Sequence, residues 1–358
     1  MNNVIVMVHG VGGTADAWSR LAPAFREKGW RVETPTLHPH KRLAENPPAD
    51  LPKVRFKDYI AEIEALARRL EAETGAAPVL FGHSMGGLIV QKLLERGVGR
   101  AGVLFTPASP GDCRGSRHPA QAVTFANILF NGDVPGRSHR IWRFGFSWGV
   151  LNLVPRAKHA GIFAGTVYDS GGVYEDIAYP DKDPERSAFV DETKITAPIL
   201  TLGGAKDRAV PIGDVRLLAE KYSRIGGDYL EYPNHAHWIL DEPGTDQVIA
   251  DIDTWLTSRG IAPGATKPEA TAKAKAQAPR PAAPAPKPRA QAAKAVAKPA
   301  AGKPAVKAKP VTVAKPKATA AMKAKAAPVA KPVTKPTPKP VAKAATKAKT
   351  PVRKPKST

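Results

Sequence analysis

Short runs of apolar residues recur through the first 260 residues of the chain. Residues 3–8 read NVIVMV, and after the first asparagine every position is apolar, which is the pattern of a strand buried on both faces of a sheet. Comparable runs follow at intervals. They predict further strands at 31–37, 78–81, 101–105, 198–202 and 228–232.

Between these runs, apolar residues recur with the spacing of a helix. Within 56–73, Ile60, Ile63, Ala67 and Leu70 fall on one face, and charged residues lie elsewhere. The same spacing predicts helices at 14–28, 85–96, 214–222 and 247–256. Strands that alternate with helices predict an α/β fold, in which a mostly parallel sheet is covered by helices on both faces.

Two segments depart from this alternation and set the predicted domain organisation. Residues 107 to about 192 lack it, so we expect them to form an insertion, or lid, within an α/β domain of residues 1–260. From Ile261 onward the chain consists mainly of Ala, Lys, Pro, Val and Thr, with 18 of the 36 prolines and no aromatic residue. Such a segment cannot bury enough apolar surface to offset its chain entropy. We therefore expect 261–358 to be a disordered Ala/Lys/Pro-rich tail.

Charge separates the same two parts of the chain. The tail holds 24 of the 54 Lys and Arg residues but one of the 32 acids, Glu269, so the first 260 residues are close to neutral. A cationic segment without aromatic side chains suits contacts with phosphates rather than stacking on bases. The tail therefore predicts binding to a polyanion, such as DNA, polyphosphate or another anionic surface.

Composition excludes several other classes of protein. The single cysteine, Cys113, excludes a disulfide framework and a zinc site built from thiolates. No apolar stretch reaches the length of about 18 residues that a transmembrane segment needs. The N-terminal residues MNNVIVMVHG have neither the basic region nor the small-residue cleavage site of a signal peptide. These features predict a cytoplasmic protein.

The strongest chemical signal is Gly82-His83-Ser84-Met85-Gly86, which lies between a predicted strand and a predicted helix. This is the pattern of a nucleophile elbow, a turn so tight that the serine takes strained backbone angles. Glycines two residues before and after the serine avoid collisions in that turn. Ser84 is then exposed at the carboxyl end of the sheet, above the positive N-terminus of a helix, and is the candidate nucleophile.

A serine nucleophile needs a histidine as base, and the histidine needs a carboxylate. Asp207 follows the fifth predicted strand and is the candidate acid, whereas no strand precedes the weaker candidates Asp181 and Asp183. Only His235 and His237 come later in the chain than Asp207. We favour His237, which directly precedes an apolar run, and keep His235 as the alternative.

The chemistry also needs an oxyanion hole formed by two backbone N–H groups. One donor is expected from Met85, the residue after the serine, and the other from the loop His9-Gly10-Val11-Gly12-Gly13 after the first strand. Val11 is the favoured donor in this loop, with Gly12 as the alternative. A phosphate-binding loop is a poorer reading, because the Lys-Ser/Thr ending of a nucleotide-binding loop and the third glycine of a dinucleotide-binding loop are both missing.

Together, Ser84, Asp207, His237 and the His-Gly loop resemble the motifs of the α/β-hydrolase superfamily, in the expected order, over residues 2 to about 258. The resemblance implies a serine ester hydrolase of the esterase or lipase type, which forms an acyl-enzyme and needs no metal or organic cofactor. It also implies a sheet trimmed to about six strands, since the strand before the oxyanion loop is the first in the chain. The tail resembles the linker-histone-like segments of bacterial proteins and the tails of some polyester-granule-associated proteins.

The expected substrate is a small-molecule ester or an acyl lipid. Six aromatic residues in the predicted lid either line an acyl pocket or pack the lid's own core: Phe125, Phe130, Trp142, Phe144, Phe146 and Trp148. Two functions stay open. The chain is either an ester hydrolase that its tail tethers to a polyanion, or a nucleic-acid-, polyanion- or granule-binding protein that uses the hydrolase body as a scaffold. The intact set of nucleophile, acid and base favours the first.

Overall fold

The computed structural model describes residues 3–115 and 118–263. The predicted tail therefore lies outside the described residues, apart from its first three positions. No helix in the described part of the chain combines the length and the apolar character needed to cross a bilayer.

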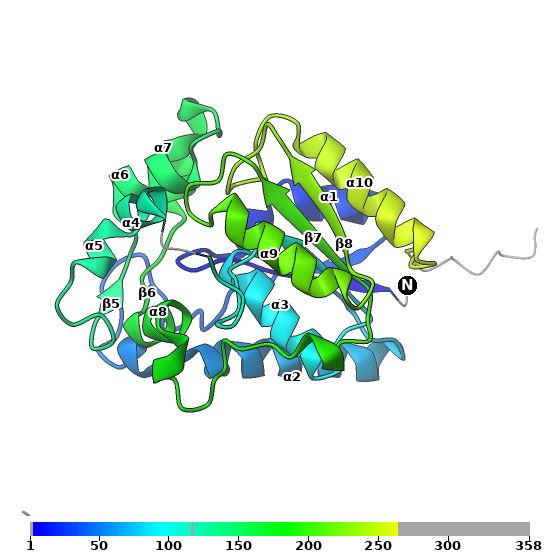
Figure 1. The fold of residues 1–358 in the computed structure, drawn as a ribbon, viewed down its shortest axis with the longest axis horizontal. Helices are drawn as coiled ribbons and strands as arrows, with labels where there is room; N and C mark the ends of the chain where they lie inside the picture. The colour runs from blue at the N-terminus through cyan, green and yellow to red at the C-terminus, as the bar shows by residue number, and fades with distance from the viewer. Residues whose placement is uncertain (1–2, 116–117, 264–358) are drawn as a thin grey trace, which may run out of the picture. The chain divides into compact units, whose positions relative to one another are not determined.

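The described residues form a six-stranded sheet in the order β2-β1-β3-β4-β7-β8, with every pairing parallel (Figure 1). This confirms the predicted α/β fold and the trimmed sheet. The strands are β1 (Val4–Val8), β2 (Arg31–Glu33), β3 (Val79–His83), β4 (Ala101–Phe105), β7 (Ile199–Gly204) and β8 (Asp228–Tyr232).

The two faces of the sheet explain why the strand sequences are almost continuously apolar. In β1, Val4, Val6 and Val8 pack into one core cluster and Ile5 and Met7 into another, and each is at most 1% exposed. Helices cover both clusters. The first lies under α2 (Phe56–Thr74), α3 (Met85–Glu95) and α9 (Ile212–Ser223), and the second under α1 (Leu21–Glu27) and α10 (Thr245–Ser258).

Two predicted elements differ from the structure, and proline explains both differences. The helix expected at 14–28 is divided into a 3₁₀ turn, Ala15–Trp18, and α1. Pro23 is tolerated only in the first turn of a helix, because it has no N–H and its ring collides with the carbonyl four residues earlier. The strand expected at 31–37 ends at Glu33, since Pro35 cannot donate to a neighbouring strand.

The predicted insertion folds into short helices and one small ribbon, which lie together at one end of the domain (Figure 1). The ribbon pairs β5 (Ser138–His139) with β6 (Asp169–Ser170) in antiparallel fashion. The helices are α4 (Pro119–Thr124), α5 (Ala126–Leu129), α6 (Arg143–Gly145), the π-helix Phe146–Val150, α7 (Arg156–Ala164) and α8 (Gly171–Ala178).

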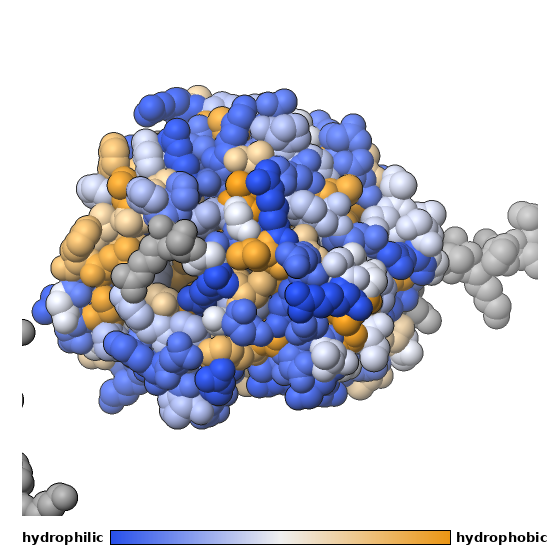
Figure 2. Space-filling view, in the orientation of Figure 1, coloured by the Kyte–Doolittle hydropathy of each residue, from blue (hydrophilic) through white to orange (hydrophobic). Residues whose placement is uncertain are grey.

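The aromatic residues of the insertion serve more than one purpose. Phe146 is buried in a small core of the insertion that also includes Trp238 of the main domain. Phe130, Trp142 and Phe144 are exposed instead, at 85%, 38% and 56%. Figure 2 shows hydrophobic residues gathered over α5 and α6, at the same end of the domain. Neither of the two simple expectations for these aromatics therefore describes all of them.

The packed body continues beyond the last helix. Ile261 is 8% exposed and lies in the same core cluster as α1 and α10. Its N–H donates to the carbonyl of Leu256 at 2.9 Å. The folded body thus includes the first residue of the segment that composition assigns to the tail.

Candidate active site

The candidate nucleophile lies in a strained turn between β3 and α3. Ser84 has φ 53° and ψ −119°, a backbone conformation that residues other than glycine rarely adopt. A Cβ atom at Gly82 would lie 2.3 Å from the carbonyl oxygen of Gly86, and one at Gly86 would lie 2.1 Å from that of Val8. Both glycines are therefore required for the close approach of strand and helix, as the elbow pattern predicts.

Asp207 and His237 are in direct contact. Nδ1 of His237 lies 2.8 Å from Oδ2 of Asp207, and both side chains are almost fully buried. The second carboxylate oxygen, Oδ1, accepts the N–H groups of Ala209 and Val210 at 2.7 and 2.9 Å. Because the carboxylate accepts, Nδ1 of His237 carries the proton and Nε2 keeps a lone pair. The imidazole is thus held in the tautomer that a general base requires.

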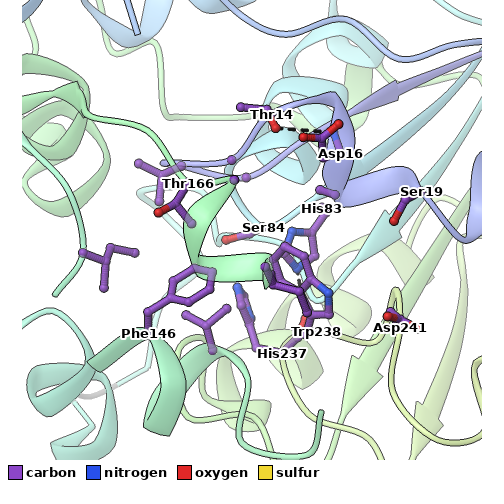
Figure 3. Close-up of a pocket in the computed structure, with 18 of the residues that line it drawn as sticks. Thr14, Asp16, Ser19, His83, Ser84, Phe146, Thr166, His237, Trp238 and Asp241 are labelled. Atoms are coloured by element: carbon purple, nitrogen blue, oxygen red, sulfur yellow. Dashed lines mark hydrogen bonds between the residues drawn. The ribbon is translucent and has the colours of Figure 1, made fainter. Parts of the chain in front are cut away.

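Ser84 and His237 face one cavity of about 110 Å³ (Figure 3). The lid and the segment after His237 supply its apolar wall, which includes Phe125, Phe146 and Trp238. No hydrogen bond joins Ser84 to His237 within the described residues. The structure therefore brings the predicted nucleophile and base to the same cavity, and the acid stands behind the base.

The weaker candidates lie elsewhere. His235 is buried, contacts the ring of Tyr232, and makes no hydrogen bond to Asp207. Asp181 forms an ion pair with Arg186 at 3.7 Å, and Asp183 accepts the N–H of Ser187 at 2.8 Å. None of these three side chains lines the cavity at Ser84.

The loop after β1 distinguishes between the two candidate oxyanion donors. The N–H of Gly12 donates to Oδ2 of Asp169 at 2.8 Å, so it is already engaged. The N–H of Gly13 is engaged as well, by the carbonyl of Gly10 at 3.1 Å. In residues 3–115 and 118–263, the N–H groups of Val11 and Met85 have no acceptor. This leaves the pair that the sequence favoured available for a ligand.

Asp169 was not predicted, and it holds the loop through a buried ion pair. Its Oδ2 lies 2.9 Å from Nη2 of Arg42, and neither side chain is exposed to solvent. Tyr59 donates its hydroxyl to Oδ1 at 2.5 Å. Burial favours the neutral carboxyl, but the charge of Arg42 and the hydrogen bonds from Gly12, Tyr59 and Arg42 together outweigh burial and keep the pKa of Asp169 below its ordinary value. The same guanidinium donates to the carbonyl of Gly13 at 2.9 Å.

Two further contacts join this loop to its surroundings. The N–H of Val167 donates to the carbonyl of Gly12 at 2.9 Å, so Gly12 is bonded to the insertion through both its N–H and its carbonyl. His9 accepts the N–H of Leu37 at 3.1 Å and donates through Nδ1 to the carbonyl of Gly10. Burial lowers the pKa of His9 to about 3, so this ring is neutral and structural.

The segment that carries His237 is fixed by buried polar groups. The carbonyl oxygen of His237 accepts hydrogen bonds from Nε2 of His83 at 2.9 Å and from the hydroxyl of Thr106 at 3.0 Å. Glu242 accepts the N–H of Ala236 at 2.7 Å and has no exposed surface. Burial, assisted by the charge of Asp207, raises the pKa of Glu242 to about 7.

Comparison with known proteins places the chain in a family. A profile of the Alpha/beta hydrolase family matches residues 5–251. The chain belongs to the alpha/beta hydrolase family. Within this family the chain is 23% identical over 270 residues to a protein named monoacylglycerol lipase from Mycolicibacterium smegmatis, a match that covers 71% of this chain and 88% of the relative.

Solved structures show the same hydrolase fold. Tomato methylketone synthase I, solved with 2-tridecanone, has a TM-score of 0.54 and 16% identity, and the match covers 72% of this chain and 99% of that one. A pyrethroid hydrolase from Sphingobium faniae has a TM-score of 0.52 and 16% identity, with 72% and 98% covered. Proteins with different names thus share this fold, so the reaction has to be argued from the site itself.

The substitution Asp169→Asn should destabilise the protein strongly, because it leaves the buried Arg42 charge without its partner. We expect the free energy of unfolding to fall by about 3–5 kcal/mol, measured by urea denaturation at neutral pH. Asp50→Asn is the matched control, since it breaks an exposed ion pair with Lys41. A similar small loss in both variants would show that the buried pair does not hold the loop.

Glu242 should make the stability depend on pH near neutrality. A carboxyl with a folded pKa of about 7 keeps its proton above the ordinary value of 4.5, so the free energy of unfolding falls as pH rises between these values, by about 3 kcal/mol in total. Glu242→Gln keeps an oxygen for the Ala236 N–H and removes this dependence.

The measurement is urea denaturation from pH 4.5 to pH 8, compared between the wild type and the variant. Glu231→Gln is the control, because Arg216 lowers the pKa of Glu231 to about 2, which moves its contribution below this window. Parallel stability curves for the wild type and Glu242→Gln would contradict the assignment.

Proposed function

We propose that this chain is a serine ester hydrolase of the lipase or esterase type. The observation that carries the proposal is the 2.8 Å contact between Asp207 and His237 at the cavity that holds the strained Ser84. The relative named monoacylglycerol lipase supports ester hydrolysis in general. Because the fold is shared with a protein named methylketone synthase, the three side chains carry more weight than the fold.

In the first half of the proposed reaction, Nε2 of His237 takes the proton from the Ser84 hydroxyl, and Oγ attacks the ester carbonyl carbon. The N–H groups of Val11 and Met85 donate to the oxyanion that forms. The protonated His237, stabilised by Asp207, then gives its proton to the alcohol oxygen. The bond between the carbonyl carbon and that oxygen breaks, and the acyl group stays on Ser84.

In the second half, a water molecule takes the place of the alcohol. His237 accepts one proton from this water, and the water oxygen attacks the acyl carbon. The same two N–H groups receive the second oxyanion. Its collapse breaks the bond to Ser84 Oγ, which recovers its proton from His237, and the carboxylic acid leaves. The cycle uses only groups of the chain and water.

The cavity indicates an ester with an apolar and a polar side. Its apolar wall is formed by lid residues such as Phe125, Ile141 and Val150, which suits an acyl group. Its other wall carries Asp16 and Asp241 and is polar. The volume of about 110 Å³ is below that of typical drug-sized pockets, about 300–1,000 Å³, so short acyl groups fit without movement of the lid.

Ser84→Ala should lower kcat for ester hydrolysis by at least about 10⁴-fold, because no other hydroxyl replaces the nucleophile. His237→Gln should give a similar loss. The matched control is His235→Gln, since His235 lies two residues away and is also buried but has no contact with Asp207. Initial rates on p-nitrophenyl esters of short and long acids measure these effects. Turnover by Ser84→Ala as fast as by wild type would exclude the serine mechanism.

We also propose that the cationic segment after Pro263 tethers the hydrolase to a polyanion. It carries all of the excess positive charge of the chain, with 24 Lys and Arg residues and one acid from Ile261 onward. The alternative, a polyanion-binding protein with an inactive hydrolase body as scaffold, predicts the same binding but no turnover. The two functions are therefore separated by the activity assay and not by the binding assay.

A chain that ends at Pro263 should keep ester hydrolysis and lose binding to DNA. This end point retains the buried Ile261. For the full chain, the logarithm of affinity should fall with the logarithm of salt by about 0.7–0.9 for each phosphate contacted, measured by fluorescence anisotropy with labelled DNA. A full-length variant with tail lysines changed to glutamine is the control for chain length. Equal DNA affinity of the full and shortened chains would exclude the tether.

A further inference from the structure

The insertion holds a second cavity, of about 250 Å³, which the proposed chemistry does not use. One side is a single face of α7, to which Arg156, His159 and Phe163 contribute at helical spacing. The opposite side is formed by α6 and the π-helix, through Arg143 and Ser147. π-Helical turns are rare and occur often at functional sites.

The charge of this cavity is not compensated. Neither Arg143 nor Arg156 has a carboxylate within 4.0 Å among the described residues, and no acidic residue lines the cavity. The surrounding segment 118–168 contains five Arg and Lys residues but a single acid, Asp133. Lys158 forms an ion pair with Asp241 at 2.8 Å, whereas the two cavity arginines have no such partner among the described residues. An anion is therefore the expected ligand.

The other polar groups of the cavity are held in place. Nε2 of His159 donates to the carbonyl of Val154 at 2.8 Å, so Nδ1 accepts the hydroxyl proton of Ser147 at 2.6 Å. Arg143 lies 5.9 Å from the ring centre of Phe163, within the range of a cation–π contact. The cavity thus combines two guanidinium groups with the hydrogen-bonded pair Ser147 and His159 and with the aromatic ring of Phe163.

One side chain separates this cavity from the catalytic one. Phe146 lines both, and its ring packs against Trp238, the residue after His237, at 6.1 Å between ring centres. The catalytic cavity carries Asp16 on its polar wall, and this carboxylate disfavours an anion there, whereas Asp241 is paired with Arg20 and Lys158. A negatively charged group on a substrate therefore has one favourable direction, past Phe146.

We propose that this second cavity binds a phosphate group carried on the alcohol part of the ester, so that acyl esters of phosphorylated alcohols are preferred over neutral esters. The planar fork of an arginine matches the oxygens of a phosphate, and two such forks are present here. The inference rests on the proposed ester hydrolysis and names its substrate class. Carboxylates carry fewer oxygens and less charge, and they are weaker ligands for this pair.

The first test compares two substrates that differ only in charge, butyrylglycerol and butyrylglycerol phosphate. In the full-length Arg143→Gln/Arg156→Gln variant, the ratio of kcat/KM for the phosphorylated ester to that for the neutral ester should fall at least about tenfold. Arg137→Gln/Lys182→Gln removes the same charge from exposed positions outside the cavity and should change this ratio by less than about twofold. An unchanged ratio in the cavity variant overturns the proposal.

The second test separates a phosphate on the substrate from free phosphate. Inorganic phosphate is titrated into full-length Ser84→Ala, with and without the two arginine substitutions, and followed by calorimetry. Binding that depends on the arginines, together with the lower ratio, supports the substrate assignment. The same binding with an unchanged ratio assigns the cavity to free phosphate and overturns the proposal that it binds a phosphate on the substrate. If the wild type hydrolyses neither ester, the proposed function and the substrate assignment are both wrong. The phosphate titration then still decides whether the cavity is an anion site.

Discussion

The buried ion pair between Arg42 and Asp169 is the contact on which the rim of the active site depends. Asp169 comes from the insertion and Arg42 from the segment after β2, and both bond to the oxyanion loop at Gly12 and Gly13. A buried pair adds little net stability, because desolvation offsets the attraction. Its effect here is orientation. With the Gly12 N–H bonded to Asp169, the loop conformation is fixed without a ligand, which is the preorganisation that the proposed oxyanion hole needs.

Parallel strands explain how distant residues meet at this rim. Ser84, Asp207 and His237 follow β3, β7 and β8, and the oxyanion loop follows β1, so all of them lie at the carboxyl edge of one sheet. Hydrogen bonds in which one partner is a main-chain group then hold Asp207 and His237. The Asp207 carboxylate receives two N–H groups, and the carbonyl of His237 receives two donors.

Much of this arrangement could be predicted from the sequence because its signals are local. Apolar runs mark the strands, and the glycines around Ser84 mark the elbow. The order of residues along the chain indicated Asp207 as the acid and His237 as the base, and these two side chains are in contact. Asp169 could not be predicted, because no pattern surrounds it and its partners Arg42 and Tyr59 are distant in the chain. The lid aromatics were ambiguous for a similar reason: Phe146 and Phe144 are two residues apart, yet one is buried and the other is 56% exposed.

The double attachment of Gly12 also limits how the lid can move. The N–H of Gly12 is bonded to Asp169, and its carbonyl accepts from Val167, so two residues of the insertion support the candidate oxyanion loop. A movement that carried residues 167–170 outward would break both hydrogen bonds to Gly12. It would also leave the Arg42 guanidinium buried without its carboxylate partner. Any rearrangement of the insertion that keeps both hydrogen bonds therefore leaves Val167 and Asp169 beside Gly12.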